Sequence, residues 1–242
     1  MNETITVNVA SIPGRGLQLY RTVKSLLPQC DHINIALNVD QYVGRGYERL
    51  ESNYNALYKL FQDPKVNYII SDNTLGDGAR YLFDNTGWLL TVDDDIEYPP
   101  TYVQDMIEGG RRYWGSIITL HGAVMKPGPR ESLYGPNDRL RAYRCLAGVS
   151  EDVRVEIAGT GVMCFHSDIF KVDLSRFERR NMADLWVAVL AHEKGIPIIC
   201  LAHELGYLTY TLPTDKFTIH GASFWDKELA KYQAGIINKY LR

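Results

Sequence analysis

The chain has 242 residues, of which 45% are hydrophobic and 23% are charged, fractions that are ordinary for a folded globular protein. This length accommodates one large α/β domain or two small ones and is enough to bury a substantial core. The net charge of −3 excludes a general polyanion-binding field, so we expect no nucleic acid as a partner, although a nucleotide ligand is compatible with it.

Hydrophobic periodicity predicts alternating strands and helices through the first half of the chain. The predicted strands cover 4–10, 32–39, 66–70 and 87–92, the predicted helices cover 17–27 and 48–61, and 75–83 begins as a loop and continues as a helix. Alternation of this kind favours a parallel sheet with crossover helices.

The second half of the chain has a more mixed pattern. Pro99 and Pro100 open a helix that ends near Gly109 and Gly110, because proline suits a first turn and glycine a helix end. Further strands are predicted at 116–125, 141–145, 153–158, 162–166 and 198–202, further helices at 181–194 and 226–240, and a long loop at 126–138. No repeat or linker interrupts the chain, so we predict a single α/β domain whose sheet is flanked by helices.

Three consecutive carboxylates, Asp93, Asp94 and Asp95, directly follow the apolar strand 87–92. They repel one another and cannot all be buried without partners, but a divalent cation would relieve the repulsion. Alternation along the chain places Asp93 and Asp95 on one side and Asp94 on the other. Ligands of open α/β sheets bind beyond the carboxyl ends of strands, which favours a site here over the alternative of a solvated acidic turn.

The strand, the triplet and the following 96–102 together resemble the Asp-x-Asp segment of GT-A glycosyltransferases, especially inverting family 2. The resemblance implies a GT-A-like, Rossmann-type mixed sheet in one domain, 1–242, with a nucleotide-binding half at about 1–98, an acceptor half at about 99–213 and a C-terminal lid and helix at about 214–242. It also implies a Mn²⁺ or Mg²⁺ cofactor and a nucleotide-sugar donor, for which UDP is the default base. The acceptor would be a glycan, free, lipid-linked or protein-linked.

The resemblance assigns a role to each aspartate and to segments around them. Asp93 would contact the nucleotide, Asp94 would support the site or touch the donor sugar, and Asp95 would bind the metal. The nucleotide-binding candidates elsewhere are Ser11 and Arg15 in the first loop, Asp40 after the second strand, and Asp77 and Arg80 in a Gly-x-Gly-x-Ala-Arg segment. The alternatives are a solvated arginine at 15 and an ordinary turn residue at 40.

The acceptor half carries the candidate base. The turn Gly159-Thr160-Gly161 resembles the family's small-residue turn beside the donor sugar, and Asp184, at the start of a helix, matches the family's catalytic carboxylate. Asp184 would take the proton of the acceptor hydroxyl. The alternative is that Asn181 caps this helix and Asp184 serves only as its third, helix-stabilising residue.

Histidines and aromatic residues complete the candidates. His220 would become a metal ligand when a C-terminal lid closes, as in several GT-A enzymes, and His121 is a second candidate near the acceptor or the metal. Tyr134 and Trp225 are possible platforms for stacking a sugar, by analogy only.

Two other functions remain open. A sugar-nucleotide nucleotidyltransferase would need a glycine-rich phosphate loop, and Pro13-Gly14-Arg15-Gly16 resembles such a loop only distantly. A non-catalytic sugar- or nucleotide-binding module would need no base at Asp184.

The remaining features concern location. The four cysteines lack the paired spacing of a zinc site and are predicted to be small buried side chains in a reducing compartment. The first residues do not form a secretory signal, and no apolar run approaches the roughly 18 residues that span a bilayer. We therefore expect a cytoplasmic protein, peripheral to a membrane at most.

Overall fold

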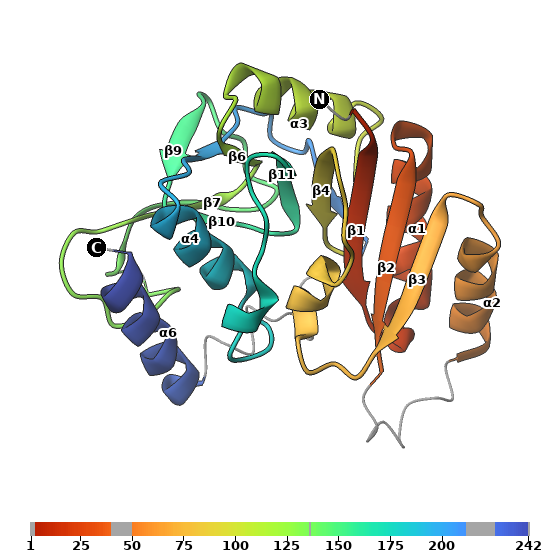
Figure 1. Cartoon of the computed structure of the whole chain (residues 1–242), viewed down its shortest axis with the longest axis horizontal. Helices are drawn as coiled ribbons and strands as arrows, with labels where there is room; N and C mark the ends of the chain where they lie inside the picture. The colour runs from red at the N-terminus through yellow and green to blue at the C-terminus, as the bar shows by residue number, and fades with distance from the viewer. Residues whose placement is uncertain (1–2, 40–49, 136, 212–225, 242) are drawn as a thin grey trace.

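An eight-stranded mixed sheet forms the centre of the structure, a computed structural model that describes residues 3–39, 50–135, 137–211 and 226–241 (Figure 1). The strand order is β3-β2-β1-β4-β11-β6-β12-β9. These strands are β1 (Ile5–Ser11), β2 (His32–Asn38), β3 (Val66–Ser71), β4 (Trp88–Val92), β6 (Ile117–Thr119), β9 (Val153–Val155), β11 (Val162–His166) and β12 (Ile198–Cys200).

The first half of the chain forms the parallel half of the sheet, as its alternating pattern predicts. Strands β3, β2, β1 and β4 are parallel neighbours. The next strand, β11, is antiparallel to β4 and to β6, which makes the sheet mixed. The predicted α/β class with one mixed sheet is therefore confirmed.

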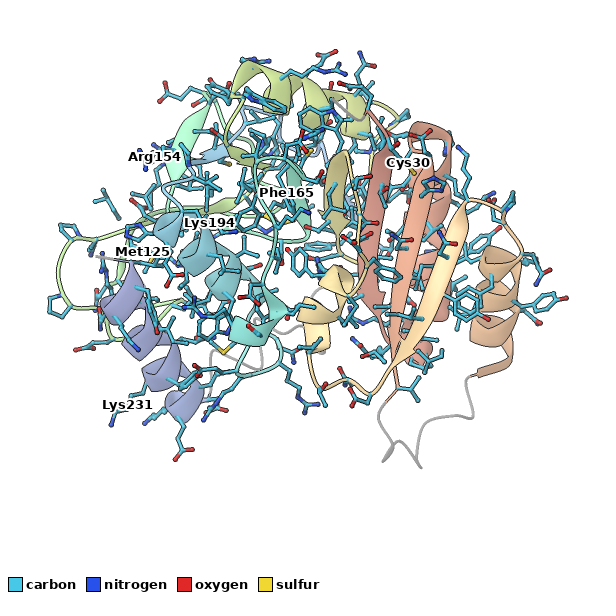
Figure 2. All side chains as sticks on the ribbon, in the orientation of Figure 1. Cys30, Met125, Arg154, Phe165, Lys194 and Lys231 are labelled. Atoms are coloured by element: carbon cyan, nitrogen blue, oxygen red, sulfur yellow. The ribbon has the colours of Figure 1, made fainter. Side chains whose placement is uncertain are left out.

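Helices cover both faces of this sheet, and side chains fill the space between the layers (Figures 1 and 2). Successive strand residues alternate between two hydrophobic cores, as pleating requires. Leu90 and Ile118 pack with α1 (Gly16–Leu26), α2 (Leu50–Phe61) and α3 (Tyr102–Arg112). Leu89 and Ile117 pack on the opposite face with α4 (Ala183–Glu193) and α6 (Lys227–Tyr240).

The predicted strands 116–125 and 153–158 are each divided between two sheets, so these two predictions are wrong. The first consists of β6 and β7 (Gly122–Met125), and the second of β9 and β10 (Ile157–Ala158). Strands β7 and β10 join β8 (Arg139–Tyr143) in a separate three-stranded antiparallel sheet. The division follows from a turn at Leu120 and His121, where the Thr119 hydroxyl donates a 2.8 Å hydrogen bond to the His121 carbonyl and turns the chain out of the main sheet.

Smaller differences concern short elements. The segment 75–83 contains a 3-10 helix, η4 (Gly76–Tyr81), and two further 3-10 turns, η1 (Pro13–Arg15) and η2 (Leu27–Gln29), flank α1. A third 3-10 turn, η5 (Leu174–Arg176), precedes α4, and a two-stranded sheet pairs β5 (Ile96–Glu97) with β13 (Thr209–Tyr210). None of the helices in the described part of the chain has the length and apolar character needed to cross a bilayer. The cysteines are unpaired, and all except the half-buried Cys145 are buried, in agreement with the prediction for their side chains.

Candidate functional site

The acidic triplet lies at the carboxyl edge of the parallel strands, and strand register determines its neighbours. Val92, the last residue of β4, pairs with Val9 of β1 on one side and with Val162 of β11 on the other. Two residues further along, β1 therefore brings Ser11 beside Asp94. This edge is where open α/β sheets bind ligands, as predicted from the sequence.

Asp94 accepts hydrogen bonds from two residues of the first loop, Ser11 and Arg15. Its Oδ2 accepts a 2.6 Å hydrogen bond from the Ser11 hydroxyl, and its Oδ1 accepts a 2.6 Å bond from Nη1 of Arg15. The Asp94 side chain is only 6% exposed, against 39% for Asp93. Burial raises the pKa of Asp94, and the Arg15 guanidinium opposes that rise. Asp94 is thus a buried support, and Arg15 is paired rather than merely solvated. Because Nη1 of Arg15 lies 2.6 Å from Asp94 and 3.5 Å from Asp95, the predicted placement of these two carboxylates on opposite sides is wrong.

Asp95 is a largely buried carboxylate with unfavourable negative neighbours. Burial and the charges of Asp93 and Asp94 raise its pKa to about 7, and the Arg15 guanidinium 3.5 Å away offsets this only in part. No group of three histidine, cysteine or acidic side chains in the described ranges forms a ready metal cage. Mg²⁺ is usually held by one or two carboxylates together with substrate phosphates, so a cation that arrives with a diphosphate fits Asp95.

Asp93 is bound by a buried arginine. Nη2 of Arg80 donates to Oδ1 of Asp93 at 3.0 Å, and the Arg80 side chain is almost fully buried. Its other donors reach the backbone carbonyls of Val92, Thr160 and Asp77 at 2.9–3.1 Å. Arg80 thus reaches a carboxylate of its own chain, and its predicted contact with the nucleotide stays a prediction. Because most of its five N–H groups serve protein acceptors, the geometry makes it a link between segments rather than an open diphosphate ligand.

The turn Gly159-Thr160-Gly161 lies between the triplet and Asp184. Gly161 faces Asp93 across β11 and β4, and its carbonyl accepts a 3.3 Å hydrogen bond from the Asp93 amide. A Cβ atom at Gly161 would lie 2.0 Å from Oδ2 of Asp93, and one at Gly159 would lie 1.6 Å from Nε2 of His121. Only glycine permits these approaches, which explains the small residues that the sequence analysis singled out.

Asp184 holds this turn. Its Oδ1 accepts hydrogen bonds from both the amide of Thr160, at 2.8 Å, and the Thr160 hydroxyl, at 2.6 Å. Within the described residues, no hydrogen bond reaches the other carboxylate oxygen of Asp184, which is half-buried. The carboxylate is therefore fixed through one oxygen and leaves the second available.

The alternative in which Asn181 caps α4 is wrong, although Asp184 does lie in the first turn of this helix, where a carboxylate interacts favourably with the helix dipole. The N-cap residue is Met182, which makes no capping bond, and Asn181 has a positive φ of 60°. The cap comes from Asp77, whose two oxygens accept the Ala183 amide at 3.3 and 3.2 Å. Asp77 thus binds the helix start by a contact across 106 residues, and its predicted contact with the nucleotide stays a prediction.

Because Asp77 is buried here, the free energy of unfolding should depend on pH through its titration. Burial raises its pKa from 3.8 to about 7, against the attraction of Arg80. The unfolded chain loses this proton near pH 4 and the folded chain near pH 7, so wild-type stability should fall across that interval and level off above it. Asp77→Asn, which keeps an acceptor for the Ala183 amide, should remove the part of the fall that Asp77 contributes.

We therefore expect Asp77→Asn to match the wild type below pH 4 and to exceed its unfolding free energy by roughly 1–4 kcal/mol at pH 8, since one pKa unit corresponds to about 1.4 kcal/mol. Urea denaturation at several pH values measures this difference. The contribution of Asp95 to the pH dependence cancels from the difference, because Asp95 titrates in both proteins. If the unfolding free energies of the wild type and Asp77→Asn differed by the same amount at every pH, Asp77 would not titrate as described.

The close approach at Gly161 predicts a second stability effect. Gly161→Ala should push the Asp93 carboxylate off Arg80 and lower the unfolding free energy by roughly 1–3 kcal/mol, as overpacking does. Gly235→Ala on the exposed face of α6 is the matched control, because a Cβ there meets no heavy atom within 4 Å. That control should be neutral or up to about 1 kcal/mol more stable in urea denaturation. Equal effects of the two substitutions would contradict the crowding at Gly161.

Two further polar groups lie near these residues, namely His121 and the buried Asn8. His121, half-buried beside Gly159, has an Nδ1 atom that is buried without a partner among the described residues. Burial lowers its pKa, and the charges of Asp184 and Asp93 oppose this. The side chain of Asn8 donates to the Arg80 carbonyl at 2.8 Å and accepts from Asn34 at 2.9 Å. The sequence analysis missed Asn8, although a polar residue within an apolar strand was the available signal.

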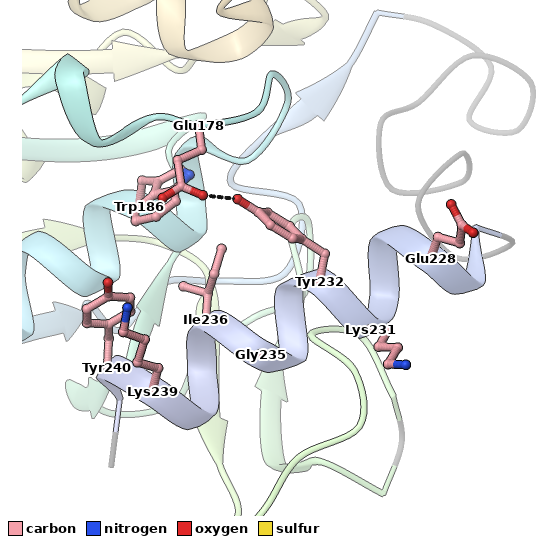
Figure 3. A pocket seen from close by; sticks show the side chains of 9 residues that line it. All are labelled: Glu178, Trp186, Glu228, Lys231, Tyr232, Gly235, Ile236, Lys239 and Tyr240. Atoms are coloured by element: carbon pink, nitrogen blue, oxygen red, sulfur yellow. Dashed lines mark hydrogen bonds between the residues drawn. The ribbon is translucent and has the colours of Figure 1, made fainter.

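A groove of about 510 Å³ between α4 and α6 is separate from this site (Figure 3). Trp186 lines it, and Tyr232 donates a hydrogen bond to Glu178 at its edge. Residues two positions apart on a helix face different directions, so Trp186 turns away from the space beside Asp184. The groove therefore contributes no residue to the candidate site.

Several predicted residues lie outside the described part of the chain. These are Asp40, His220, Trp225 and the lid segment 214–224. No protein-family model and no curated protein matches the chain. The site has to be understood from its own residues.

Proposed function

We propose that the chain is a metal-dependent glycosyltransferase with a GT-A-like fold that moves a sugar from a nucleotide-diphosphate sugar to an acceptor hydroxyl with inversion. The observation that carries this proposal is the Gly159-Thr160-Gly161 turn, which contacts Asp93 on one side and Asp184 on the other. The acidic triplet would thus bind the donor on one side of this turn, and Asp184 would face the acceptor on the other side. A single displacement uses groups on both sides of the reacting carbon in this way.

The donor side supplies two carboxylates, Asp93 with 39% and Asp95 with 13% of its side chain exposed. Asp93 is the most exposed member of the triplet and is oriented by Arg80, which suits a contact with the nucleotide. Asp95 would hold Mn²⁺ or Mg²⁺, and such an ion offsets the charge of a departing diphosphate. Ser11 and Arg15 position the triplet through Asp94.

The acceptor side supplies the base. Two hydrogen bonds from Thr160 fix Oδ1 of Asp184, and Oδ2 would accept the proton of the acceptor hydroxyl as its oxygen attacks the anomeric carbon. The base and the donor lie on opposite sides of the reacting carbon in such a displacement, so the product has inverted configuration.

One assay separates this proposal from its two rivals. The full chain is incubated with UDP-sugars and Mn²⁺, and free UDP is measured, because transferases usually hydrolyse their donor slowly. A nucleotidyltransferase would release sugar phosphate only when pyrophosphate is added, and a non-catalytic binding module would release neither product. Either of these outcomes would overturn the proposal.

A further inference from the structure

Arg139 lies at the start of the small sheet that leads into the candidate site. It begins β8 and pairs with Met125 of β7, and β7 in turn pairs with β10. His121 immediately precedes β7, and Gly159 immediately follows β10 and donates its amide to the His121 carbonyl at 2.9 Å. One end of the small sheet, where Gly122 pairs with Tyr143, is therefore attached to the turn that Asp184 holds, and Arg139 lies toward the other end, opposite Met125.

The Arg139 guanidinium has no carboxylate partner in the part of the chain that the structure describes. Its Nε donates to the Leu133 carbonyl at 2.8 Å, and its guanidinium carbon lies 4.9 Å from the centre of the Tyr134 ring. Among the described residues no ion pair includes Arg139, although the side chain is half-buried. A cation that is partly removed from water without a counter-charge costs free energy, which an anionic ligand would recover.

The charge of Asp184 acts on the pKa of Arg139 and of neighbouring groups. Burial lowers its pKa, and Tyr134 and the Asp184 carboxylate oppose that change. The Asp184 charge also acts on the pKa of His121 and of Tyr134. The pKa of Asp95, by contrast, depends chiefly on burial, its aspartate neighbours and Arg15. The candidate base Asp184 is thus one of the charges that act on the pKa of Arg139.

We propose that the acceptor carries a negatively charged group, a carboxylate or a phosphate, and that Arg139 binds it. This inference rests on the proposed function, because it names the substrate class of the same site. Arginine presents paired N–H donors that match both carboxylate and phosphate oxygens, and its Nη groups make no hydrogen bond within the described part of the chain. An anionic acceptor anchored there would present a neighbouring hydroxyl to Asp184.

The test measures binding of three small probes to the full chain in the presence of UDP and Mn²⁺, by calorimetry or ligand-observed NMR. Methyl β-D-glucuronide carries a carboxylate, glucose 6-phosphate carries a phosphate, and methyl β-D-glucoside is neutral. We expect one anionic probe to bind about 10-fold or more tightly than the glucoside, and the choice between the two identifies the anion. Arg139→Gln should abolish the preference, and Arg139→Lys should keep part of it.

Arg141→Gln is the matched control, because Arg141 is exposed on the same strand and lies 4.9 Å over Tyr143. It should leave the preference unchanged. The proposal is overturned if no anionic probe is preferred, if the preference survives Arg139→Gln, or if Arg141→Gln removes it equally. It is also overturned if Arg139→Gln weakens UDP binding instead. Probe binding needs no turnover, so a failed UDP-release assay would reject the transferase independently of this result.

Discussion

Asp184→Asn is expected to reduce sugar transfer by about 10²–10⁴-fold, the usual contribution of a general base, while donor and metal binding stay close to wild type. The asparagine oxygen can keep both hydrogen bonds from Thr160, so the turn beside the triplet should retain its shape. The amide nitrogen that replaces Oδ2 cannot accept a proton. The substitution therefore removes the proposed chemistry and preserves the structure.

The measurement combines transfer rate, UDP binding and melting temperature. Asp173→Asn is the matched control, because Asp173 is an exposed carboxylate whose side chain caps the short helix η5. It should keep the wild-type rate. A single displacement also predicts inverted anomeric configuration, readable by proton NMR of the product. Near-normal turnover in Asp184→Asn would remove Asp184 from the mechanism, and a retained configuration would exclude the displacement itself.

The sequence was sufficient to predict the parallel half of the fold, because local periodicity and the order of elements constrain it strongly. Strands 32–39 and 87–92 were placed within one residue of β2 and β4 at each end. The rule that parallel strands present their carboxyl ends at one edge then located the triplet. Alternation along 93–95 did not predict the arrangement of the three carboxylates, because Asp94 and Asp95 lie in a turn and both face Nη1 of Arg15.

Contacts between distant segments could not be predicted in the same way. Asn181 was the natural local cap for α4, but Asp77 supplies the cap across 106 residues. Local preference was overridden because Asn181 occupies a left-handed turn packed against Gly76. The break between β6 and β7 could not be predicted from local pattern either. The apolar pattern continues through 116–125, whereas the chain passes from one sheet to another at His121.

The second large effect expected is the metal dependence of nucleotide binding. Removing Mn²⁺ should weaken UDP binding by about 10²-fold or more, since like charges about 4 Å apart repel by about 4 kcal/mol at an effective dielectric of 20, and every 1.4 kcal/mol is tenfold. Asp93 and Asp95 would face the diphosphate with Arg80 and Arg15 already engaged by carboxylates. The two arginines therefore cannot replace the ion.

Asp95→Ala tests which carboxylate holds the metal. The variant should bind UDP weakly with Mn²⁺ and should gain little when Mn²⁺ is added, because its cation ligand is gone while Asp93 keeps its bond to Arg80. Asp84→Ala is the matched control, since it removes one exposed negative charge beside His32 at the start of β2, the opposite end of the sheet from the triplet. Calorimetry with and without Mn²⁺ on the three proteins measures the dependence. If wild-type UDP affinity were equal in both conditions, the triplet would not be a metal site, and if Asp95→Ala kept the full Mn²⁺ response, the ligand would have to be another residue.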